Sequence, residues 1–351
     1  MRFLLFPISL IYGIIIFLRN LLFDIKILPS KSFDIPVISV GNISVGGTGK
    51  TPHVEYLIKL LKKNNHLAVL SRGYRRNTKG YITATDFSSV KEIGDEPRQY
   101  KQKFDGIEVA VCECRKTGIK NLLKLFQDLS VILLDDAFQH RWVKPGLSIL
   151  LTDYHYLYSD DYLLPVGNLR EFQNSSKRAN IIVISKTPSI LSPILRRSLL
   201  KKIKLLPKQN IYFSFVKYGE MKLLPNIICE NPPKKHYCIL LITGIANPDP
   251  LEEYIARECV ELEKIKFPDH HKYSVKDMMK IRETFHNIAS VNKIIVTTEK
   301  DAMRLESPDL LKVIQGLPIY YIPIETEFHK KDKTDFDKKI LDYVKKNQRN
   351  N

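Results

Sequence analysis

The most constraining feature of this chain is a glycine-rich stretch, ISVGGTGKTP, at residues 43–52. It follows a short β-branched run, IPVISV (35–40), and leads into TPHVEYLIKLLKK (51–63), whose apolar residues recur at helical spacing. In a strand, turn and helix of this kind, backbone N–H groups and the helix N-terminus converge on phosphate oxygens. The order therefore predicts a phosphate-binding loop.

The loop departs from the general pattern at Ser44, where a first glycine is usual. The later glycines still allow close backbone approach, Lys50 is placed to reach the β- and γ-phosphates, and the Thr51 hydroxyl can ligate Mg²⁺. A glycine turn that binds nothing is the alternative, and the strand-to-helix context favours the phosphate loop. The predicted ATP-binding residues are Ser44, Val45, Gly46, Gly47, Thr48, Gly49, Lys50 and Thr51.

Further apolar runs predict the rest of the fold. The first series lies at 67–71, 107–111, 131–136, 147–153 and 180–186. Alternation of such runs with helical stretches is typical of a parallel, doubly wound α/β sheet with both faces covered. Residues 211–224 predict two strands around a Tyr-Gly-Glu turn, interpreted as an interdomain ribbon, and a second α/β series follows. The predicted domains are an apolar helix (1–24), a P-loop domain (25–208), a β-ribbon linker (209–236) and a second α/β domain (237–351).

The N-terminus carries sixteen uncharged residues, FLLFPISLIYGIIIFL (3–18), between Arg2 and Arg19. As a helix they reach about 24 Å, short of a hydrocarbon core of roughly 30 Å. A monotopic anchor that dips into one leaflet, with basic residues at the headgroups, fits this segment best. A cleaved signal peptide and a buried core helix are the alternatives. Because the segment precedes the first strand, we expect its removal to leave the P-loop domain folded.

The chain is basic, with a net charge of +17 that favours an anionic partner such as a phosphate-bearing substrate or an acidic membrane surface. Nucleic acid is not expected, because the charge is spread along the chain and no recognised module accompanies it. The five cysteines include no C-x-x-C pair and indicate reduced thiols in a cytosolic protein rather than disulfides or a zinc site.

A pair of carboxylates follows a buried strand in VILLDDAFQH (131–140). A phosphate loop needs acidic groups at the end of a neighbouring strand to hold Mg²⁺, and Asp135 and Asp136 meet this need. A single aspartate there would more often be a helix cap. Two of them, followed by Gln139 and His140, favour a metal-facing loop with the hard oxygen ligands that suit Mg²⁺.

Three more polar clusters follow predicted strands of the first domain: SRGYRR (71–76), GDEP (94–97) and LLPVGNLRE (163–171). Each alone is typical of a solvated turn, but loops at the carboxyl ends of parallel strands gather at one crevice. Arg72, Tyr74 and Arg170 are therefore predicted to line the site. In the second domain FPDHHKY (267–273) adds an Asp-His pair that can serve as an acid/base element.

Together these motifs resemble those of the tetraacyldisaccharide 4′-kinase family. The matching segments are VGNISVGGTGKTP, LSRGYRR, GDEP, LDDAFQHR, LLPVGNLRE, ITGIANP, FPDHH and TTEKDAMRL, spread from Val40 to Leu305. The family also has a hydroxyl residue at the position of Ser44, so this departure from the broad pattern agrees with the narrower one.

The resemblance implies an ATP- and Mg²⁺-dependent kinase that phosphorylates the 4′-hydroxyl of tetraacyl disaccharide 1-phosphate, giving lipid IVA. It places the protein at the cytoplasmic face of the inner membrane of a Gram-negative bacterium. It also implies two α/β/α domains with mostly parallel sheets, joined by a β-ribbon, with ATP in the cleft.

The resemblance also assigns roles at matching positions. Lys50 and Thr51 serve phosphate and Mg²⁺, and Asp135 and Asp136 take the Walker B-like position. Asp95 acts as the base for the sugar hydroxyl, with His270 as its partner through an Asp269–His270 pair, while a role for the adjacent His271 stays open. The residues that line the metal and nucleotide site are Glu96, Gln139, His140 and Glu171.

Two other classes of function compete with the kinase. A membrane-associated P-loop ATPase that acts as a transport or regulatory switch would turn over ATP without a glycolipid acceptor. A basic membrane adaptor with a degenerate loop would bind no nucleotide. The apolar segment and the Asp-His pair favour the kinase, because a switch needs neither.

Overall fold

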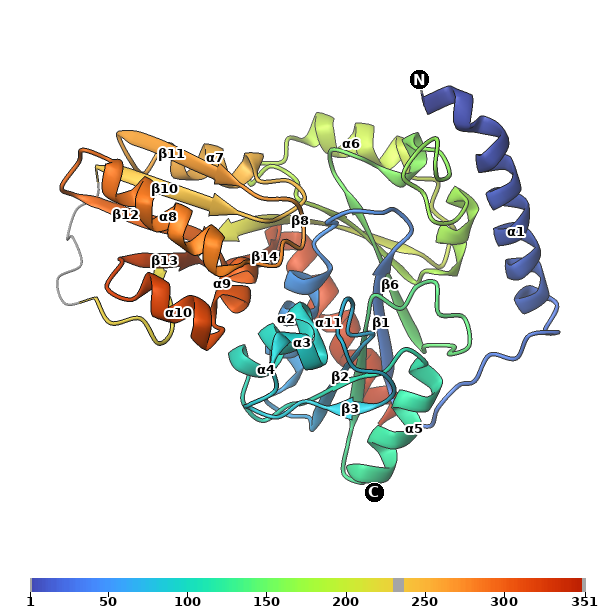
Figure 1. Cartoon of the computed structure of the whole chain (residues 1–351). Coiled ribbons are helices and arrows are strands. Elements are labelled where there is room, and N and C mark those ends of the chain that lie inside the picture. The colour runs from blue at the N-terminus through green and yellow to red at the C-terminus, as the bar shows by residue number, and fades with distance from the viewer. Residues whose placement is uncertain (1, 230–236, 349–351) are drawn as a thin grey trace. The chain divides into compact units, whose positions relative to one another are not determined.

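The computed structural model describes residues 2–229 and 237–348. The chain divides into two compact units, which are described separately: unit 1 comprises Met1–Lys217 and Glu325–Asn351, and unit 2 comprises Tyr218–Ile324 (Figure 1). The chain therefore passes between the units twice, once in each direction.

Unit 1 is built on a nine-stranded sheet with the order β14-β8-β7-β6-β1-β5-β2-β4-β3. Strands β1, β2 and β4 to β8 pair in parallel, and β3 pairs antiparallel to β4. The strands are β1 (Val37–Asn42), β2 (Leu67–Ser71), β3 (Ile82–Thr83), β4 (Glu108–Val111), β5 (Val131–Asp135), β6 (Leu147–Asp153), β7 (Ile181–Ser185), β8 (Asn210–Tyr218) and β14 (Ile324–Phe328). Since β1 is central, the strand order reverses beside it, and ligands of open α/β sheets bind at such a switch point.

Helices cover both faces of this sheet, as the uninterrupted apolar strands require. In β1, Ile38 packs with the side chains of one face, which include Leu57 of α2, whereas the neighbouring Val37 packs with Ile119 of α5 on the other face. The helical elements of unit 1 are η1 (Arg2–Leu5), α1 (Phe6–Asp24), α2 (Lys50–Leu61), α3 (Val90–Ile93), α4 (Asp95–Lys103), α5 (Arg115–Leu125), η2 (Tyr158–Asp160), η3 (Gln173–Arg178), α6 (Pro193–Lys202) and α11 (Lys330–Asn347).

Unit 2 has a five-stranded sheet with the order β11-β10-β12-β13-β9, parallel except for β9. Its strands are β9 (Lys222–Leu223), β10 (Cys238–Thr243), β11 (Glu261–Lys266), β12 (Lys293–Thr298) and β13 (Ile319–Ile322). Its helices are α7 (Asp249–Ile255), α8 (Val275–Asn287), α9 (Glu299–Leu305) and α10 (Pro308–Ile314). The predicted fold class, two α/β units with mostly parallel sheets, is confirmed.

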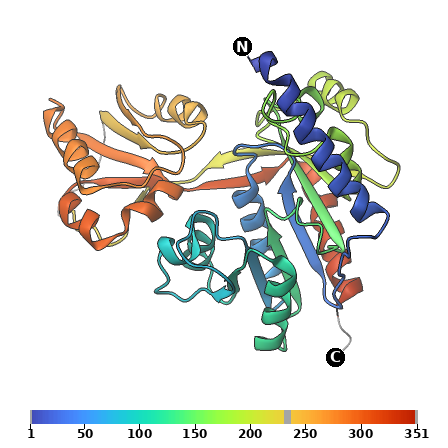
Figure 2. The same cartoon turned by 45° about the vertical axis from the view of Figure 1, so that its right-hand side comes forward.

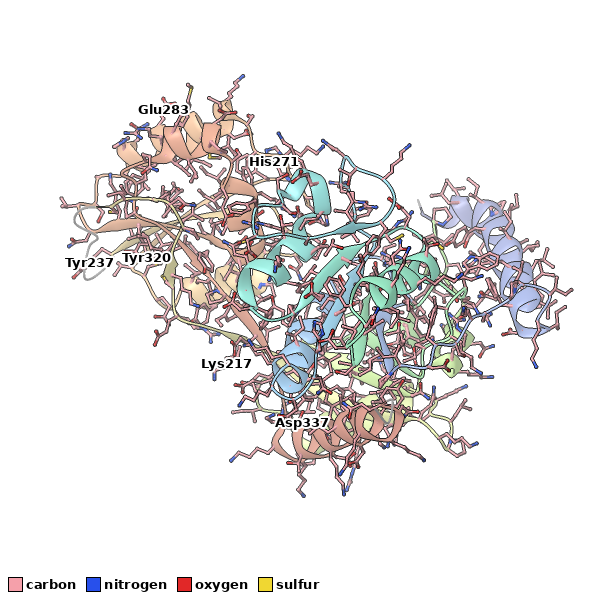
Figure 3. The ribbon with its side chains drawn as sticks, turned by 90° about the horizontal axis from the view of Figure 1, so that it is seen from below. Lys217, Tyr237, His271, Glu283, Tyr320 and Asp337 are labelled. Atoms are coloured by element: carbon pink, nitrogen blue, oxygen red, sulfur yellow. The ribbon has the colours of Figure 1, made fainter. Side chains whose placement is uncertain are left out.

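The C-terminal segment differs from the prediction that 237–351 form one domain. β14 and α11 return to unit 1, where β14 lies next to β8 in the sheet. The physical reason is the apolar side of α11: Phe336 stacks on Phe328 with ring centroids 4.3 Å apart, and Ile340 is fully buried in the same core. Asp337 on α11 accepts a hydrogen bond of 2.6 Å from Tyr56 on α2 (Figure 3).

The predicted ribbon also differs in its pairing. β8 and β9 both form, but they belong to different sheets and are not partners. Instead, the segment that leaves unit 1 lies beside the segment that returns to it, since the Gly219 amide donates to the Pro323 carbonyl at 2.9 Å. The two connecting segments, yellow and red-orange, are visible in Figure 2. Residues 230–236 of the predicted linker lie outside the described residues.

Helix α1 lies within the predicted apolar helix (1–24) and extends beyond the sixteen-residue uncharged run. It spans nineteen residues and its mean hydropathy and length meet the criteria for a membrane-crossing helix. Pro7 lies in its first turn, where proline is tolerated, so the helix is not interrupted. Only 17% of the apolar stretch of this helix is buried in the protein. Length therefore does not distinguish a spanning helix from one that lies in one leaflet.

Candidate active site

The phosphate loop joins the end of β1 to the start of α2, as predicted. Gly49 caps α2 with a φ of +83°, and Gly46 has a φ of +103°, both in the region that favours glycine. Thr48 fixes the shape of the loop through its side chain and its carbonyl. Thr48 is buried, accepts a hydrogen bond from Asn42 Nδ2 at 2.9 Å, and its carbonyl accepts one from Ser185 Oγ at 2.8 Å. The loop is thus held in shape before nucleotide binds.

Ser44 is buried as well, and the loop is tied there to the segment 163–171. Ser44 forms a β-bridge with Leu169, the Val45 amide donates to the Asn168 carbonyl at 2.8 Å, and the Arg170 amide donates to the Ile43 carbonyl at 2.7 Å. The predicted convergence of these two loops is therefore observed in unit 1.

His53, near the start of α2, supports the phosphate loop through hydrogen bonds of its ring. Its Nδ1 lies 2.7 Å from the Gly49 carbonyl and its Nε2 lies 2.9 Å from Ser214 Oγ. Burial lowers the pKa of His53 to about 4, so the ring is neutral. Because a carbonyl can only accept, Nδ1 carries the proton and Nε2 accepts from the serine hydroxyl.

Asp135 ends strand β5, and Asp136 follows it in a turn beside the phosphate loop. Asp135 is buried, and its Oδ2 accepts a hydrogen bond of 3.3 Å from Tyr100. Burial raises the pKa of Asp135 to about 7, and the charges of Glu96 and Asp136 add to the effect. Its Oδ1 has no hydrogen-bond partner among the residues that the structure describes.

Asp136 faces two cations. Lys50 Nζ lies 3.6 Å from its Oδ1 and Arg170 Nη1 lies 3.4 Å from its Oδ2. Burial raises the pKa of this carboxyl, but the charges of Lys50 and Arg170 outweigh it, so the net pKa is below the ordinary value. Asp136 is therefore ionised at neutral pH and holds the lysine that is expected to bind phosphate.

The residues present fit a magnesium ion. Asp135 Oδ1 and Asp136 Oδ1 are buried and make no hydrogen bond among the described residues, and the Thr51 hydroxyl lies in the first turn of α2. Within residues 2–229 and 237–348, no group of three or more His, Cys, Asp or Glu side chains is arranged to enclose a metal. An open pair of carboxylates suits Mg²⁺, which keeps waters and phosphate oxygens as ligands.

The GDEP and SRGYRR segments lie against each other. A Cβ at Gly94 would meet the Tyr74 carbonyl at 3.2 Å, and one at Gly73 would meet the Ile93 carbonyl at 2.9 Å. Asp95 and Glu96 form the first turn of α4, where the helix dipole favours carboxylates. Arg72 and Tyr74 are exposed.

His140 and Gln139 have structural contacts. His140 Nε2 accepts from the Arg115 amide at 3.1 Å, and burial, followed by the charges of Arg115, Arg19 and Arg72, lowers the pKa of His140 to about 4. Gln139 Nε2 donates to the Asn42 carbonyl at 2.7 Å. Both side chains therefore hold loops of unit 1 next to the two aspartates and the phosphate loop.

Glu171 is fully buried; one of its oxygens is paired, and its Oε1 has no hydrogen-bond partner among the described residues. Its Oε2 accepts from Arg178 Nη2 at 2.8 Å and from Asn20 Nδ2 at 3.0 Å. Arg170, next to it, reaches Asp136. The adjacent pair thus links the carboxylate site to η3 and to helix α1.

Asp269 and His270 lie in unit 2 and are not hydrogen-bonded to each other. Asp269 Oδ2 is 3.9 Å from His270 Nε2, beyond hydrogen-bond range. Arg304 Nη2 lies 3.1 Å from His270 Nδ1, and since arginine only donates, Nδ1 accepts. His271 is occupied differently: its Nε2 lies 3.1 Å from Asp277 and its ring stacks on Phe267.

In each unit the sequence did not indicate some of the residues that contact the predicted site residues. Arg304 and Asp301, which form an ion pair of 2.8 Å beside His270, lie in the quoted TTEKDAMRL segment without an assigned role. Arg115 is buried and donates to the Asp135 carbonyl at 3.0 Å. The sequence around Arg115 carries no signal for this role, since a buried arginine that binds backbone carbonyls needs no charged neighbour in sequence.

Comparisons with known proteins agree with the motifs. A model of the family described as tetraacyldisaccharide-1-P 4′-kinase matches residues 1–345. The chain is 46% identical to the tetraacyldisaccharide 4′-kinase of Bacteroides thetaiotaomicron (99% of this chain, 94% of that protein). It is 45% identical to the enzyme of that name from Flavobacterium johnsoniae (99% and 98%).

Among solved structures, the chain resembles the "apo" form of LpxK from Aquifex aeolicus, crystallised in complex with ATP at 2.2 Å resolution. The TM-score is 0.72 at 27% sequence identity, and the match covers 98% of this chain and 99% of that one. A match of fold and sequence over nearly the full length of both chains confirms the resemblance read from the motifs. The chain belongs to the tetraacyldisaccharide-1-P 4′-kinase family.

Proposed function

We propose that this protein transfers the γ-phosphoryl group of ATP to the 4′-hydroxyl of tetraacyldisaccharide 1-phosphate, forming lipid IVA. Family membership supports the reaction. The observation that carries the proposal is the phosphate loop with Lys50 3.6 Å from Asp136, at the strand-order switch of a parallel sheet. Such an arrangement is suited to holding a nucleotide triphosphate beside paired carboxylates.

In this proposal the loop amides and Lys50 hold the phosphates of ATP. Thr51, Asp135 and Asp136 would hold Mg²⁺, which when bound neutralises charge on the transferring phosphoryl group. Arg170, already 3.4 Å from Asp136, adds positive charge at the same place. Phosphoryl transfer needs little covalent chemistry from the protein, so positioning and charge account for most of the catalysis.

We further propose that Asp95 accepts the proton of the sugar hydroxyl and that His270 assists it. Asp95 lies in the first turn of α4, next to Glu96, whose charge is felt by Asp135. His270 is oriented by Arg304, whose contact with Nδ1 leaves Nε2 as the nitrogen that can carry a proton. Arg304 therefore supports His270, and Asp269 lies 3.9 Å from Nε2, within ion-pair distance of a protonated ring.

Helix α1 is proposed to seat the protein on the cytoplasmic face of the inner membrane. The exposed apolar side chains on this helix include Leu10, Ile11, Ile14, Ile15, Phe17 and Leu18. Other side chains of the helix are hydrogen-bonded to unit 1, which favours a helix that lies with one side on the protein and the other in lipid. The net charge of +17 adds attraction to anionic headgroups.

The test is a direct assay. Purified protein is incubated with ATP, Mg²⁺ and tetraacyldisaccharide 1-phosphate, and the lipid is examined by mass spectrometry for one added phosphate. Release of ADP is measured in parallel with and without the lipid. ADP release that needs no lipid, with no phosphorylated product, would favour the ATPase switch, and absence of nucleotide binding would favour the adaptor.

A further inference from the structure

One side of helix α1 is packed against unit 1, and this side is polar as well as apolar. Its members recur at helical spacing and are buried or half-buried: Ser9, Tyr12, Gly13, Ile16, Arg19, Asn20 and Phe23, here called the inner stripe. Approach is close, because a Cβ at Gly13 would lie 3.0 Å from side-chain atoms of both Leu163 and Phe172. Most of the remaining helix surface is exposed and apolar, except the half-buried Leu22 and the charged Asp24 at the C-terminal end.

Four side chains of the inner stripe donate hydrogen bonds to two neighbouring loops. In chain order these are Ser9 Oγ to the Leu163 carbonyl (3.1 Å), Tyr12 Oη to the Arg170 carbonyl (2.8 Å), Arg19 Nη2 to the Gln139 carbonyl (2.7 Å) and Asn20 Nδ2 to Glu171 Oε2 (3.0 Å). All four acceptors lie in the loops that follow β5 and β6. These loops carry Asp136, Gln139, His140, Arg170 and Glu171 of the candidate site.

The same loops touch the phosphate loop and the carboxylates. Arg170 binds the Ile43 carbonyl through its amide and approaches Asp136 through its guanidinium. Gln139 binds the Asn42 carbonyl. Two of the four residues that α1 holds, Arg170 and Gln139, therefore contact the proposed nucleotide site directly, and Glu171 follows Arg170 in the chain.

A helix that served only as an anchor would gain nothing from these contacts. Burying a polar group costs free energy unless it is hydrogen-bonded, and the four donors each meet an acceptor at a defined position, whereas Asn20 Oδ1 and Glu171 Oε1 have no partner among the described residues. Asn20 is the most specific member, because it meets a fully buried carboxylate whose other bonding partner is Arg178. The geometry indicates a fixed docking of the helix on the catalytic loops.

We propose that α1 positions the catalytic loops as well as anchoring the protein, and that Asn20 is a positioning residue that acts through Glu171. The inference rests on the proposed kinase function. It also revises the expectation that the N-terminal segment can be removed without consequence for the first domain. The exposed side of the helix then binds the membrane, and the inner stripe holds the loops of the ATP site.

The test separates the two sides. Asn20→Leu keeps the size of the side chain, removes the donor and makes the helix more apolar, so weaker membrane binding cannot explain a defect. We expect kcat on detergent-dispersed acceptor to fall about 10- to 100-fold, as for loss of a supporting partner, with little change in acceptor KM. Co-sedimentation with anionic phospholipid vesicles should be unchanged or stronger.

The matched control is Ile15→Ser on the exposed side of the same helix. It should weaken vesicle binding and raise the acceptor KM while kcat at saturating acceptor is kept. Tyr12→Phe, which removes only the hydroxyl that binds the Arg170 carbonyl, provides a second inner-stripe variant if Asn20→Leu does not fold. It should lower kcat in the same direction.

The coupling to Glu171 is tested with Asn20→Leu combined with Glu171→Gln. If Asn20 acts through Glu171, the double variant is no slower than Glu171→Gln alone. Multiplicative losses, or inner-stripe variants with wild-type kcat, overturn the inference while the wild type still phosphorylates the lipid. A wild-type protein that does not phosphorylate the lipid contradicts the proposed function instead.

Discussion

Lys50 Nζ lies 3.6 Å from Asp136 Oδ1, so the cation expected to bind phosphate forms an ion pair with the carboxylate expected to bind metal. Both side chains are largely shielded, with exposed fractions of 17% and 34%. Nucleotide binding would replace this contact with bonds to phosphate and Mg²⁺. The pair is therefore arranged in advance for the two ligands of the reaction.

Lys50→Ala removes the charge that stabilises the transferring phosphoryl group. We expect kcat to fall by at least about 10²–10³-fold with the fold intact, since charge stabilisation dominates this chemistry. Lys59→Ala is the matched control, because that lysine lies on the same helix and pairs with Glu325 at the surface. Circular dichroism should be alike for all three proteins. Near-normal lipid phosphorylation by Lys50→Ala would refute the phosphate-loop assignment.

His53→Phe should loosen the phosphate loop. The substitution leaves the Gly49 carbonyl and the Ser214 hydroxyl without their buried partner, at a cost of about 1–3 kcal/mol for each such group. We expect a lower free energy of unfolding and a higher KM for ATP. Ser214→Ala removes only the second contact, so it should destabilise less and leave the KM for ATP near the wild-type value. Equal effects of both variants on that KM would show that the contact with Gly49 is not what shapes the loop.

Asp135 gives the metal-free protein a characteristic dependence on pH. Its pKa is raised from 3.8 to about 7, so the folded state retains a proton that the unfolded chain has released. Stability from this group is therefore lost as the pH rises through that window, by at most about 1.4 kcal/mol per pH unit. Asp135→Asn should become more stable relative to the wild type between pH about 4 and about 7.

The measurement is urea unfolding in EDTA across this range. His53 and His140 act in the opposite direction, because their pKa values are lowered to about 4 and stability is lost as the pH falls from 6.5 towards that value. Both histidines are present in both proteins, so their contribution cancels in the difference. Adding Mg²⁺ at neutral pH should stabilise the wild type more than the variant. Parallel pH curves would mean that Asp135 is not the group that titrates.

The local patterns of the sequence were sufficient to predict the strands of the first sheet and the phosphate loop. The predicted runs 67–71 and 147–153 are β2 and β6 to the residue, because strands buried on both faces are uninterrupted apolar runs. Asp135 and Asp136 were found because strand ends in a parallel sheet share one edge. These inferences depend only on neighbours in sequence and on the general geometry of α/β folds.

The parts that were missed depend on contacts between distant segments. The local sequence does not show that α11 returns to unit 1, because an amphipathic helix can pack on any apolar surface. The contact of Phe336 with Phe328, which selects unit 1, is seen only in the folded structure. The bond from Asn20 to Glu171 joins residues 151 positions apart, and the contact of Arg304 with His270 joins residues 34 apart. In both cases the sequence shows the chemical groups but not the pairing.

Activation of the acceptor hydroxyl is the proposed task of Asp95 and His270. A sugar hydroxyl is a poor nucleophile at neutral pH, and a positioned base contributes roughly 10²–10⁴-fold to its reaction. Asp95→Asn and His270→Ala should therefore each lower kcat by a large factor while the affinity for ATP changes little. The affinity is measured separately by equilibrium binding, so that a defect in chemistry is not mistaken for a defect in binding.

The vicinal histidine provides the control. His271 is held by Asp277 and by stacking on Phe267, so His271→Gln should change stability more than kcat. If Asp95 and His270 act on the same proton, the double variant should be scarcely slower than the slower single variant. Strictly multiplicative losses would mean that the two residues act independently, and the Asp95–His270 pair would then be abandoned although the kinase assignment stands. A loss with His271→Gln as large as that with His270→Ala would instead transfer the role to the other histidine.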